Sequence, residues 1–364
     1  MKLILAPNSF RDSLTAFEAV AAMKRGINRA GLKAEVIERP MADGGDGTLQ
    51  VVVQALDADL IRQRVTGPLG GKVEAIWGMT ASGTAIIEMA EAAGNRLLPA
   101  KKRNPMMANT YGVGELIRAA LDRGAREILI GAGGSATVDG GAGALAALGV
   151  RFLDRGGNPL QPTPAALMGL KRVDLGTMDH RLSNTRLTVL ADVKTPARHA
   201  ARLYGPQKNL NPADHPKITT FWRRLAACGG KPELIEAPMS GTAGGLALGL
   251  KLFVGAEMRP GAKTIADMIG LSQSIGEADL VFTGEGRFDS SSLVGKATGV
   301  ITSLAENRIP VVVFAGSMAP GMTCPQGTTC RVITPQGQEA AAALQLAGAN
   351  LAASVANFLK TKTS

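Results

Sequence analysis

Short apolar runs, each followed by a loop and then by a helical segment, recur along this chain. The first run covers residues 3–6, and Thr15 and Glu18 stand at the spacing of a capping box that opens a helix. Gly31 is placed to end that helix, and residues 34–38 form the next apolar run. The chain therefore begins with a βαβ unit, from which parallel sheets are built.

The pattern changes near Arg62. Residues 62–66, 72–79 and 84–89 are rich in β-forming residues and are separated by tight-turn sequences, which predicts an antiparallel meander. Helix–strand alternation returns at Thr110. Further strands are predicted over residues 127–130, 150–153, 186–190, 279–283 and 311–314, and an alanine-rich helix over 338–359.

The length of 364 residues exceeds that of one typical domain. Alternation at both ends with a β-rich stretch between them predicts an α/β protein in which a second α/β domain, β-rich at its start, is inserted into a doubly wound parallel-sheet domain. We expect residues 1–64 plus 285–364 to form the outer, discontinuous domain and residues 65–284 to form the inserted one.

The formal net charge is +10, and its densest basic stretch runs over residues 194–231. Few aromatic residues are interleaved there, which is thin for a platform that stacks nucleic-acid bases. We expect a solvated basic face or a rim that attracts small anions, and no nucleic-acid partner. Its basic residues are Lys194, Arg198, Arg202, Lys208, Lys217, Arg223, Arg224 and Lys231.

The 3 cysteines are too few and too scattered for a disulfide framework or a zinc site. The first apolar run ends at Pro7 and is too short for a signal peptide. A membrane-spanning helix would need a much longer apolar run than any in this chain. We therefore expect a cytoplasmic protein without a membrane partner.

A glycine loop follows the strand predicted over residues 127–130. Residues 131–136 fit the dinucleotide fingerprint G-x-G-x-x-A, and Asp154 ends the next strand, so an NAD(P)-dependent oxidoreductase is one interpretation. Against it, glycines within residues 140–143 interrupt the helix that the fingerprint should open, and each interior glycine costs about 1 kcal/mol relative to alanine.

A second glycine loop, residues 240–245, also precedes an apolar helix. Loops of this kind free backbone N–H groups to bind anions, although simple tight turns would have the same composition. Two such loops suit several phosphates better than one pyrophosphate.

Charged residues follow other apolar runs. Glu285 and Arg287 come after a predicted strand, where ligands bind in open α/β sheets, and Lys296 precedes a helix as a phosphate-binding lysine would. The segment is not a Walker A motif, and charged groups at a strand end are often only structural. Asp192 ends another strand, where its carboxylate could accept a proton from a substrate hydroxyl, hold a metal, or simply form a turn.

Residues 43–48 form a glycine loop that carries two acids, Asp43 and Asp46. Mg²⁺ favours one or two carboxylates together with substrate phosphates, and this loop could supply them. Asp46 could equally cap the helix that follows. The three histidines stand in polar, loop-like contexts and no nucleophile elbow occurs, so chemistry rests on carboxylates, lysine and arginine.

At this point the chain resembles the bacterial glycerate kinase family. Seven segments occur in that family's order, from the first strand to about Gly316 and, more weakly, to the C-terminus. They are APNSFR (6–11), ADGGDGT (42–48), KRNP (102–105), TYGVGELI (110–117), GGSAT (133–137), YGPQK (204–208) and TGEGR (283–287).

The resemblance implies a kinase, a transferase of organic-acid and carbohydrate metabolism that phosphorylates D-glycerate with MgATP, giving 2-phosphoglycerate. It also implies a flavodoxin-like domain interrupted by a second α/β domain, with the active site in the cleft between them. ATP and Mg²⁺ are the implied cofactors, and a small molecule is the implied partner.

Residue roles follow from combining the motifs with this resemblance. Asp192 would act on the acceptor hydroxyl, and Asp43 or Glu285 would hold Mg²⁺. The predicted catalytic residues are Asp192, Lys296 and Arg287; the substrate-binding residues are Ser9, Arg11 and Asp43; the nucleotide-binding residues are Gly133, Gly134, Ser135, Thr137, Gly244 and Gly245; and the metal ligands are Asp43 and Glu285.

Several positions depart from the family pattern, among them residues 194–196 and Asn209, and three departures bear on the chemistry. Asn8 stands where an aspartate is usual, Arg11 where a lysine is usual, and Val138 where an asparagine is usual. Asn8 removes a charge, and Arg11 exchanges a compact ammonium for a planar guanidinium. Val138 removes a polar group beside the glycine loop. A divergent relative that binds a nucleotide or anion without turning over glycerate is therefore the alternative interpretation.

Overall fold

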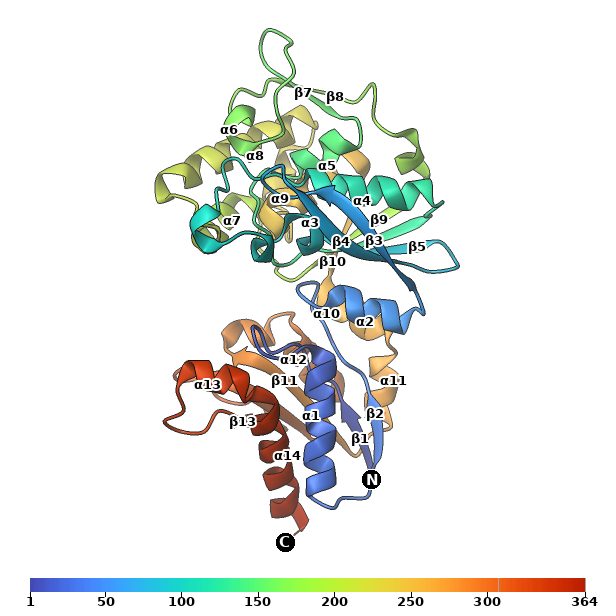
Figure 1. The fold of residues 1–364 in the computed structure, drawn as a ribbon, viewed down its shortest axis with the longest axis vertical. Coiled ribbons are helices and arrows are strands. Elements are labelled where there is room, and N and C mark those ends of the chain that lie inside the picture. Colours follow the sequence, from blue (N-terminus) through green and yellow to red (C-terminus); the bar gives the residue numbers. More distant parts are fainter. Residues whose placement is uncertain (307, 364) are drawn as a thin grey trace. The chain divides into compact units, whose positions relative to one another are not determined.

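The structure is a computed structural model that describes residues 1–306 and 308–363. The chain divides into two compact units, each with its own sheet and its own hydrophobic core (Figure 1). The first unit comprises Met1–Asp43, Gln50–Val52 and Ala262–Ser364, and the second comprises Gly44–Leu49 and Val53–Gly261.

The predicted domain limits, 64/65 and 284/285, do not coincide with the limits of these units. They fall inside β3 (Asp59–Thr66) and β11 (Leu280–Phe288), each of which pairs with its neighbours in one sheet. The limits were placed where the side-chain pattern changes along the sequence. The units are instead defined by which strands pair with one another, and pairing partners change at other positions. The division into separately folding domains, 1–64 plus 285–364 and 65–284, stays a prediction.

The first unit is built on a five-stranded sheet in the order β13-β12-β11-β1-β2, with every neighbouring pair parallel. Counted along this unit alone, the order is 2-1-3-4-5, which is that of flavodoxin-like doubly wound folds. The expected fold class is confirmed. The other strands are β1 (Lys2–Leu5), β2 (Glu35–Glu38), β12 (Val311–Met318) and β13 (Thr328–Val332).

Helices α1 (Ala16–Arg29) and α14 (Ala347–Thr363) lie side by side in this unit (Figure 1). Gly26 allows the close approach, because a Cβ there would lie 2.6 Å from the carbonyl oxygen of Ala352. The predicted capping box is present, since Thr15 and Glu18 exchange hydrogen bonds at the start of α1. The remaining helices are α10 (Gly261–Met268), α11 (Leu271–Gly276), α12 (Ala297–Ala305) and α13 (Ala340–Gln345), with the 3₁₀ turn Ser290–Leu293.

The second unit has a six-stranded mixed sheet in the order β10-β9-β6-β5-β4-β3. β5, β6, β9 and β10 run parallel, whereas β3, β4 and β5 form the predicted antiparallel meander. The strands are β4 (Lys72–Met79), β5 (Thr84–Glu88), β6 (Glu127–Gly131), β9 (Arg186–Ala191) and β10 (Glu257–Pro260), with a separate two-stranded sheet of β7 (Arg151–Leu153) and β8 (Arg172–Asp174).

Helices pack on this sheet around a core in which Trp77 and Trp222 are fully buried. Helix α2 (Thr48–Ala55) contributes residues to both units. The other helices are α3 (Ala90–Ala93), α4 (Tyr111–Asp122), α5 (Ala142–Ala147), α6 (Pro164–Leu167), α7 (Ala197–Tyr204), α8 (His215–Cys228) and α9 (Thr242–Val254). Short 3₁₀ turns span Asn95–Leu97, Ala100–Lys102, His180–Asn184, Pro206–Lys208, Pro212–Asp214 and Pro232–Ile235.

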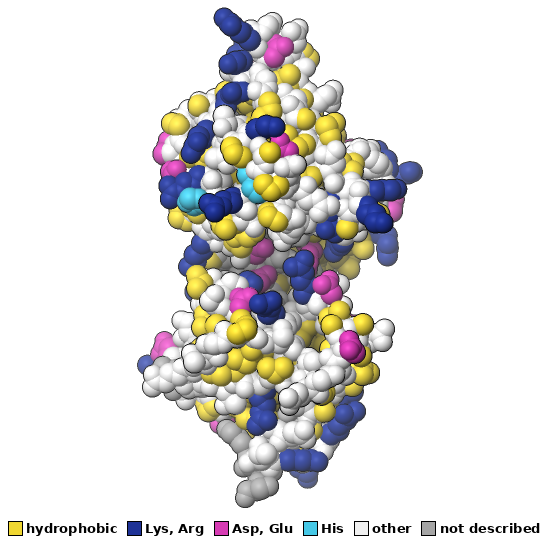
Figure 2. All heavy atoms as spheres, turned by 90° about the vertical axis from the view of Figure 1, so that its left-hand side faces the viewer, with side chains coloured by type: hydrophobic (Ala, Val, Ile, Leu, Met, Phe, Trp, Pro, Cys, Tyr) yellow, Lys and Arg dark blue, Asp and Glu magenta, His cyan; other side chains and the backbone are white. Residues whose placement is uncertain are grey.

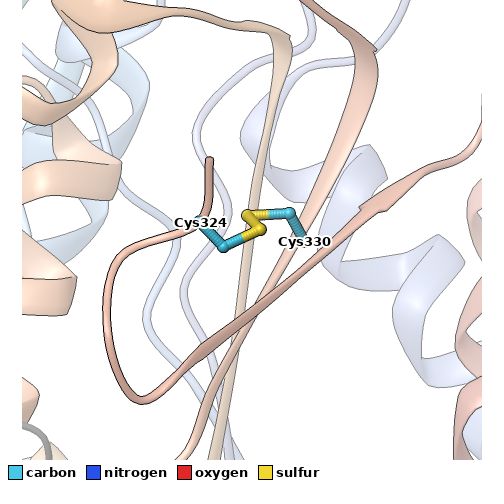
Figure 3. The surroundings of a disulfide bond; sticks show 2 residues. All are labelled: Cys324 and Cys330. Atoms are coloured by element: carbon cyan, nitrogen blue, oxygen red, sulfur yellow. A yellow bond between two sulfur atoms is a disulfide. The ribbon is translucent and has the colours of Figure 1, made fainter. Parts of the chain in front are cut away.

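Two local expectations are corrected. The helix predicted over residues 338–359 is divided into α13 and α14, which meet at Leu346. The cysteines are too few and too scattered to predict a disulfide framework, but Cys324 and Cys330 form a single disulfide in the first unit, with their Cα atoms 5.9 Å apart (Figure 3). Cys330 lies on β13, and strand pairing brings it to the loop that holds Cys324, which the six-residue spacing alone does not reveal.

None of the helices in the described part of the chain is both long enough and apolar enough to cross a membrane.

Candidate functional site

Polar groups meet at one edge of the second unit's sheet, where the parallel strands β5, β6 and β9 end. Glu88 is the last residue of β5, Gly131 is the last residue of β6, and Asp192 directly follows β9. Because the carboxyl ends of parallel strands meet at one edge, residues far apart in sequence are brought together there. This edge holds most of the residues that the glycine motifs predict.

The loop after β6 is packed directly against residues 44–46. Gly133 donates its N–H to the carbonyl oxygen of Gly44 at 3.1 Å. A Cβ on Gly133 would lie 2.3 Å from the Cα of Gly45 and 3.3 Å from Oδ2 of Asp192, so a side chain has no room there. Gly134, with φ of +66°, similarly leaves no room beside Asp46, whose Oδ1 would be 2.8 Å from a Cβ. Glycine backbone and carboxylates therefore share this edge.

The two predicted glycine loops are in contact. Gly140 donates its N–H to the carbonyl oxygen of Gly244 at 3.0 Å, and a Cβ on Gly244 would lie only 1.9 Å from the carbonyl oxygen of Thr137. The backbone of Ala243, Gly244 and Gly245 is left-handed and interrupts the start of α9. Gly244 and Gly245 are thus required both by their positive φ and by the close approach of the other loop.

Asp139 supports this pair of loops and was not selected as a site residue from the sequence. Its fully buried carboxylate accepts hydrogen bonds from the N–H and the hydroxyl of Thr110, at 2.8 and 2.7 Å, and from the N–H of Gly143 at 2.9 Å. Burial raises the pKa of Asp139, while the hydrogen bonds act in the opposite direction. The signal available in the sequence was Thr110, which opens the segment TYGVGELI (110–117) of the family resemblance.

The dinucleotide interpretation is wrong. Residues 132–141 separate β6 from α5, so the fingerprint does not open into a helix, and Gly140 and Gly141 have positive φ in the interval. Asp154 follows β7, which pairs with β8 in the separate small sheet. Its carboxylate accepts a hydrogen bond from the N–H of Asn158 and closes an exposed turn. Asp154 therefore does not follow a strand of the sheet that carries the glycine loop, as the ribose-binding acid of a dinucleotide fold does.

Glu88 is a second residue that the sequence did not single out. It is buried at the end of β5, and its Oε2 accepts the N–H of Leu49 in the first turn of α2 at 3.1 Å. This contact supplies the helix N-terminus with an acceptor, a role for which Asp46 was one candidate. Burial raises the pKa of Glu88 to about 7, against the opposing effect of the Leu49 N–H and of Arg96.

Glu88→Gln is expected to remove a pH dependence of stability. The pKa of Glu88 is about 7 in the folded protein against 4.5 ordinarily, so the stability that the neutral carboxyl contributes is present in acid and is lost as the pH rises through 7. At about 1.4 kcal/mol per pKa unit, the free energy of unfolding of the unmodified protein should fall by up to about 3 kcal/mol between pH 4.5 and 7, relative to the variant. Urea denaturation across this range measures the difference.

The exposed Glu74→Gln on β4 is the matched control, and it should follow the unmodified protein at every pH. Parallel curves for the unmodified protein and Glu88→Gln would contradict the assignment.

The first unit gathers a different set of predicted residues at its own sheet edge. Asn8 follows β1 and donates its N–H to the carbonyl oxygen of Gly284 on β11 at 2.9 Å. Its side-chain amide donates to Oδ2 of Asp43 at 3.3 Å, and its side-chain oxygen accepts the N–H of Ser9 at 2.8 Å. β1 and β11 are the neighbours at which the strand order reverses, the usual place for a ligand in this fold.

Glu285 lies in the same unit, within β11, and its carboxylate is already engaged. Oε1 accepts the hydroxyl of Thr298 at 2.6 Å and Oε2 accepts that of Ser292 at 2.9 Å. Burial raises the pKa of Glu285, whereas the two hydroxyls and Lys296 lower it. Asp43 is also close enough to Glu285 to raise its pKa electrostatically.

The predicted basic residues of this unit differ in exposure. Lys296 is half-buried and stands at the N-cap of α12, as expected. The side chain of Arg11 is 79% exposed and pairs with Asp12, and that of Arg287 is 67% exposed and pairs with Asp289. Exposed cations of this kind can turn toward an anionic ligand without losing a buried partner.

These residues fit Mg²⁺ only as a site completed by a substrate. Within residues 1–306 and 308–363, no group of three or more His, Cys, Asp or Glu side chains is placed to hold a metal ion. Mg²⁺ commonly binds through one or two carboxylates and substrate phosphates, so Asp43 suits it. Glu285 suits it less well, because both of its oxygens already accept hydroxyls.

Lys208 differs from the other basic residues of the segment 194–231 because its side chain is buried. On the face drawn in Figure 2, Lys and Arg side chains lie singly or in small groups among neutral and acidic ones. Lys208, expected on a solvated face or rim, is instead only 2% exposed and donates to groups of the glycine loop. Its burial depends on tertiary packing and could not be read from local composition.

Comparison with known proteins agrees with these motifs. The sequence profile of the glycerate kinase family matches residues 3–363. A protein of Bacillus subtilis (strain 168) named glycerate kinase is 41% identical over 328 residues, which are 88% of this chain and 86% of that protein. A protein of Escherichia coli (strain K12) named glycerate 2-kinase is 38% identical over 326 residues, 87% of this chain and 86% of that one.

A solved structure extends the comparison to the fold. The crystal structure of a protein from Salmonella typhimurium LT2, named as glycerate kinase 2, matches with a TM-score of 0.82 and 34% sequence identity. The match covers 100% of this chain and 98% of the solved one. On the sequence profile, the relatives and the fold together, the chain belongs to the glycerate kinase family, a family of kinases.

Proposed function

We propose that this protein transfers the γ-phosphoryl group of ATP to the 2-hydroxyl of D-glycerate and releases 2-phosphoglycerate and ADP. Membership of the glycerate kinase family supports the acceptor, and the relative named glycerate 2-kinase supports the position of the hydroxyl. The observation that carries the proposal is the close approach of the glycine loop at Gly133 to the carboxylate of Asp192. Phosphoryl transfer needs an anion-binding backbone and a group that handles the acceptor proton, side by side.

The two glycine loops are proposed to bind the nucleotide phosphates. Gly133 and Gly134 have no side chain to cover their backbone, and Gly244 and Gly245 stand in a left-handed turn at the start of α9. Successive N–H groups in such turns bind anions. The hydroxyl of Thr137 is buried and has no hydrogen-bond partner among the described residues, as expected of a loop that is completed by a ligand.

Asp192 is proposed to orient the acceptor hydroxyl and receive its proton. As the proton passes to the Asp192 carboxylate, the hydroxyl oxygen forms its bond to the γ-phosphorus. The bond from that phosphorus to the β–γ bridging oxygen breaks, and its electron pair leaves with ADP. The end of a parallel strand holds the carboxylate at a fixed position, which favours a direct transfer.

Ser9, Arg11 and Asp43 are proposed to bind glycerate. The planar guanidinium of Arg11 can pair with the substrate carboxylate through two parallel hydrogen bonds. The hydrogen bond from Asn8 fixes the Asp43 carboxylate, so Asn8 keeps a positioning role where the family pattern has an acid.

Lys296 and Arg287 are proposed to neutralise charge on the transferring phosphoryl group. Lys296 stands at the N-terminus of α12, where the backbone N–H groups also favour an anion. Mg²⁺ would be held by Asp43 together with phosphate oxygens, and it would offset the negative charge of the triphosphate. Glu285 is the second candidate ligand, and it would have to release the hydroxyl of Ser292 or Thr298 to bind the ion.

An assay of ADP release tests the proposal directly. The protein is supplied with MgATP and either D-glycerate, L-glycerate or a small panel of other hydroxy acids, and the product is identified by phosphorus NMR. We expect turnover with D-glycerate and a 2-phosphoglycerate signal. A 3-phosphoglycerate signal would correct the position of transfer. An ATP-binding protein that releases no ADP with any of these acids would contradict the proposal and favour the divergent, non-catalytic alternative.

A further inference from the structure

Lys208 is a buried cation that none of the proposed catalytic steps uses. It ends the 3₁₀ turn Pro206–Lys208, and only 2% of its surface is exposed. Its Nζ donates to the hydroxyl of Ser135 at 2.6 Å and to the carbonyl oxygen of Thr137 at 2.7 Å. A single ammonium group therefore joins a distant turn to both ends of the segment 135–137.

The charges around Lys208 lie on several elements. Asp139 in the same loop and Asp192 after β9 both favour the charged ammonium, and burial opposes them strongly enough to lower the pKa of Lys208 to about 8. Arg103, whose guanidinium donates to the carbonyl oxygen of Gln207, is the nearby cation on the side of the 3₁₀ turn. Burying a lysine costs free energy unless its ammonium group is paired. A side chain that served only to pack the turn Pro206–Lys208 against the loop would more simply be apolar.

The position of Lys208 links it to both proposed functions of this sheet edge. Through Ser135 and Thr137 it holds the segment that we assign to the nucleotide phosphates. Through its charge it acts on Asp192, the proposed proton acceptor. The ammonium group also places a positive charge beside the carbonyl oxygen of Thr137 in this loop.

We propose that Lys208 is a positioning residue for phosphoryl transfer, which holds Ser135 and Thr137 in their phosphate-binding conformation and supplies the positive charge that lets phosphates bind beside Asp192. The inference rests on the proposed nucleotide-binding function of this loop. It does not require Lys208 to touch the substrate.

The test compares Lys208→Met with Lys208→Arg, with the exposed Lys231→Met as the matched control. ATP binding is measured by tryptophan fluorescence, and kcat and KM for ATP are measured between pH 6.5 and 9.5. We expect Lys208→Met to bind ATP at least tenfold more weakly while its thermal unfolding stays cooperative, and Lys208→Arg to recover part of the affinity. Lys231→Met should behave as the unmodified protein.

The pH profile is the measurement that a merely structural role would leave unchanged. In the unmodified protein, ATP affinity should decrease on the alkaline side, as Lys208 loses its proton, and Lys208→Met should lose that decrease. The alkaline decrease in the unmodified protein can be measured on its own, whether or not a variant folds well. Unchanged ATP affinity in Lys208→Met, or a flat alkaline profile in the unmodified protein, would overturn the inference.

The outcomes separate this inference from the proposed function. An unmodified protein that binds ATP but does not phosphorylate D-glycerate would refute the glycerate assignment, and the binding comparison would still decide the role of Lys208. An unmodified protein that binds no ATP at any pH would overturn both.

Discussion

Asp192→Asn is expected to lower kcat by about 10²- to 10⁴-fold and to leave the fold nearly unchanged. The amide keeps the size and the hydrogen-bonding reach of the carboxylate, but it cannot take the proton of the acceptor hydroxyl. Asp192 is partly buried and follows β9 at the edge where the parallel strands end, so replacing its carboxylate by an amide of the same size removes no apolar group. Initial rates with MgATP and D-glycerate, together with a thermal unfolding curve, measure the two effects separately.

Asp154→Asn is the matched control, because the same chemical change is made at an exposed turn of the second unit. Its turnover should equal that of the unmodified protein. Near-normal turnover by Asp192→Asn would remove Asp192 from the mechanism. Loss of activity in Asp154→Asn alone would instead revive a role for the turn after β7.

Gly133→Ala is expected to cause the second large effect, on binding as well as on turnover. An added Cβ would lie 2.3 Å from the Cα of Gly45, and backbone cannot yield as a flexible side chain does. Either the loop or the segment 44–46 must move, and a shift of about 1 Å in a positioned site costs on the order of 10² in rate. Overpacking of this kind also destabilises a fold by about 1–3 kcal/mol.

Gly71→Ala is its control within the same unit. Gly71 lacks positive φ, and nothing lies within 4 Å of a Cβ built on it. Its variant should keep normal kcat, KM for ATP and denaturation midpoint. If Gly133→Ala binds ATP and turns over as the control does, the loop is not a phosphate site and the proposed function loses its main structural support.

The elements of the fold could be predicted well where local signals determine them. The capping box of Thr15 and Glu18, the meander of β3–β5 and the strand over residues 72–79 all depend on residues near each other in sequence. Strand ends were less well predicted: β11 continues to Phe288, beyond the predicted end at residue 283, because its partner β12 extends with it. Pairing with a distant strand is not visible in a local window.

Some residues of the candidate site could likewise be identified from the sequence, and others could not. Glycines 133 and 134 and the acid at 192 could be selected from the sequence because they follow an apolar strand, and glycines 244 and 245 because they precede an apolar helix. The charged residues Glu88, Asp139 and Lys208 could not be selected, since each resembles an ordinary polar residue until its burial is known. The contact between Gly140 and Gly244 is likewise a result of folding.

The sequence by itself determined the α/β class, the order of the strands along the chain, the glycine loops and the membership of the glycerate kinase family, because these follow from local patterns and ordered motifs. Only the tertiary structure decided the strand order within each sheet, the pairing of Cys324 with Cys330 and the burial of Lys208 against Ser135. These features depend on contacts between residues far apart in sequence. Their free energies come from packing and desolvation, which exist only once the chain has folded.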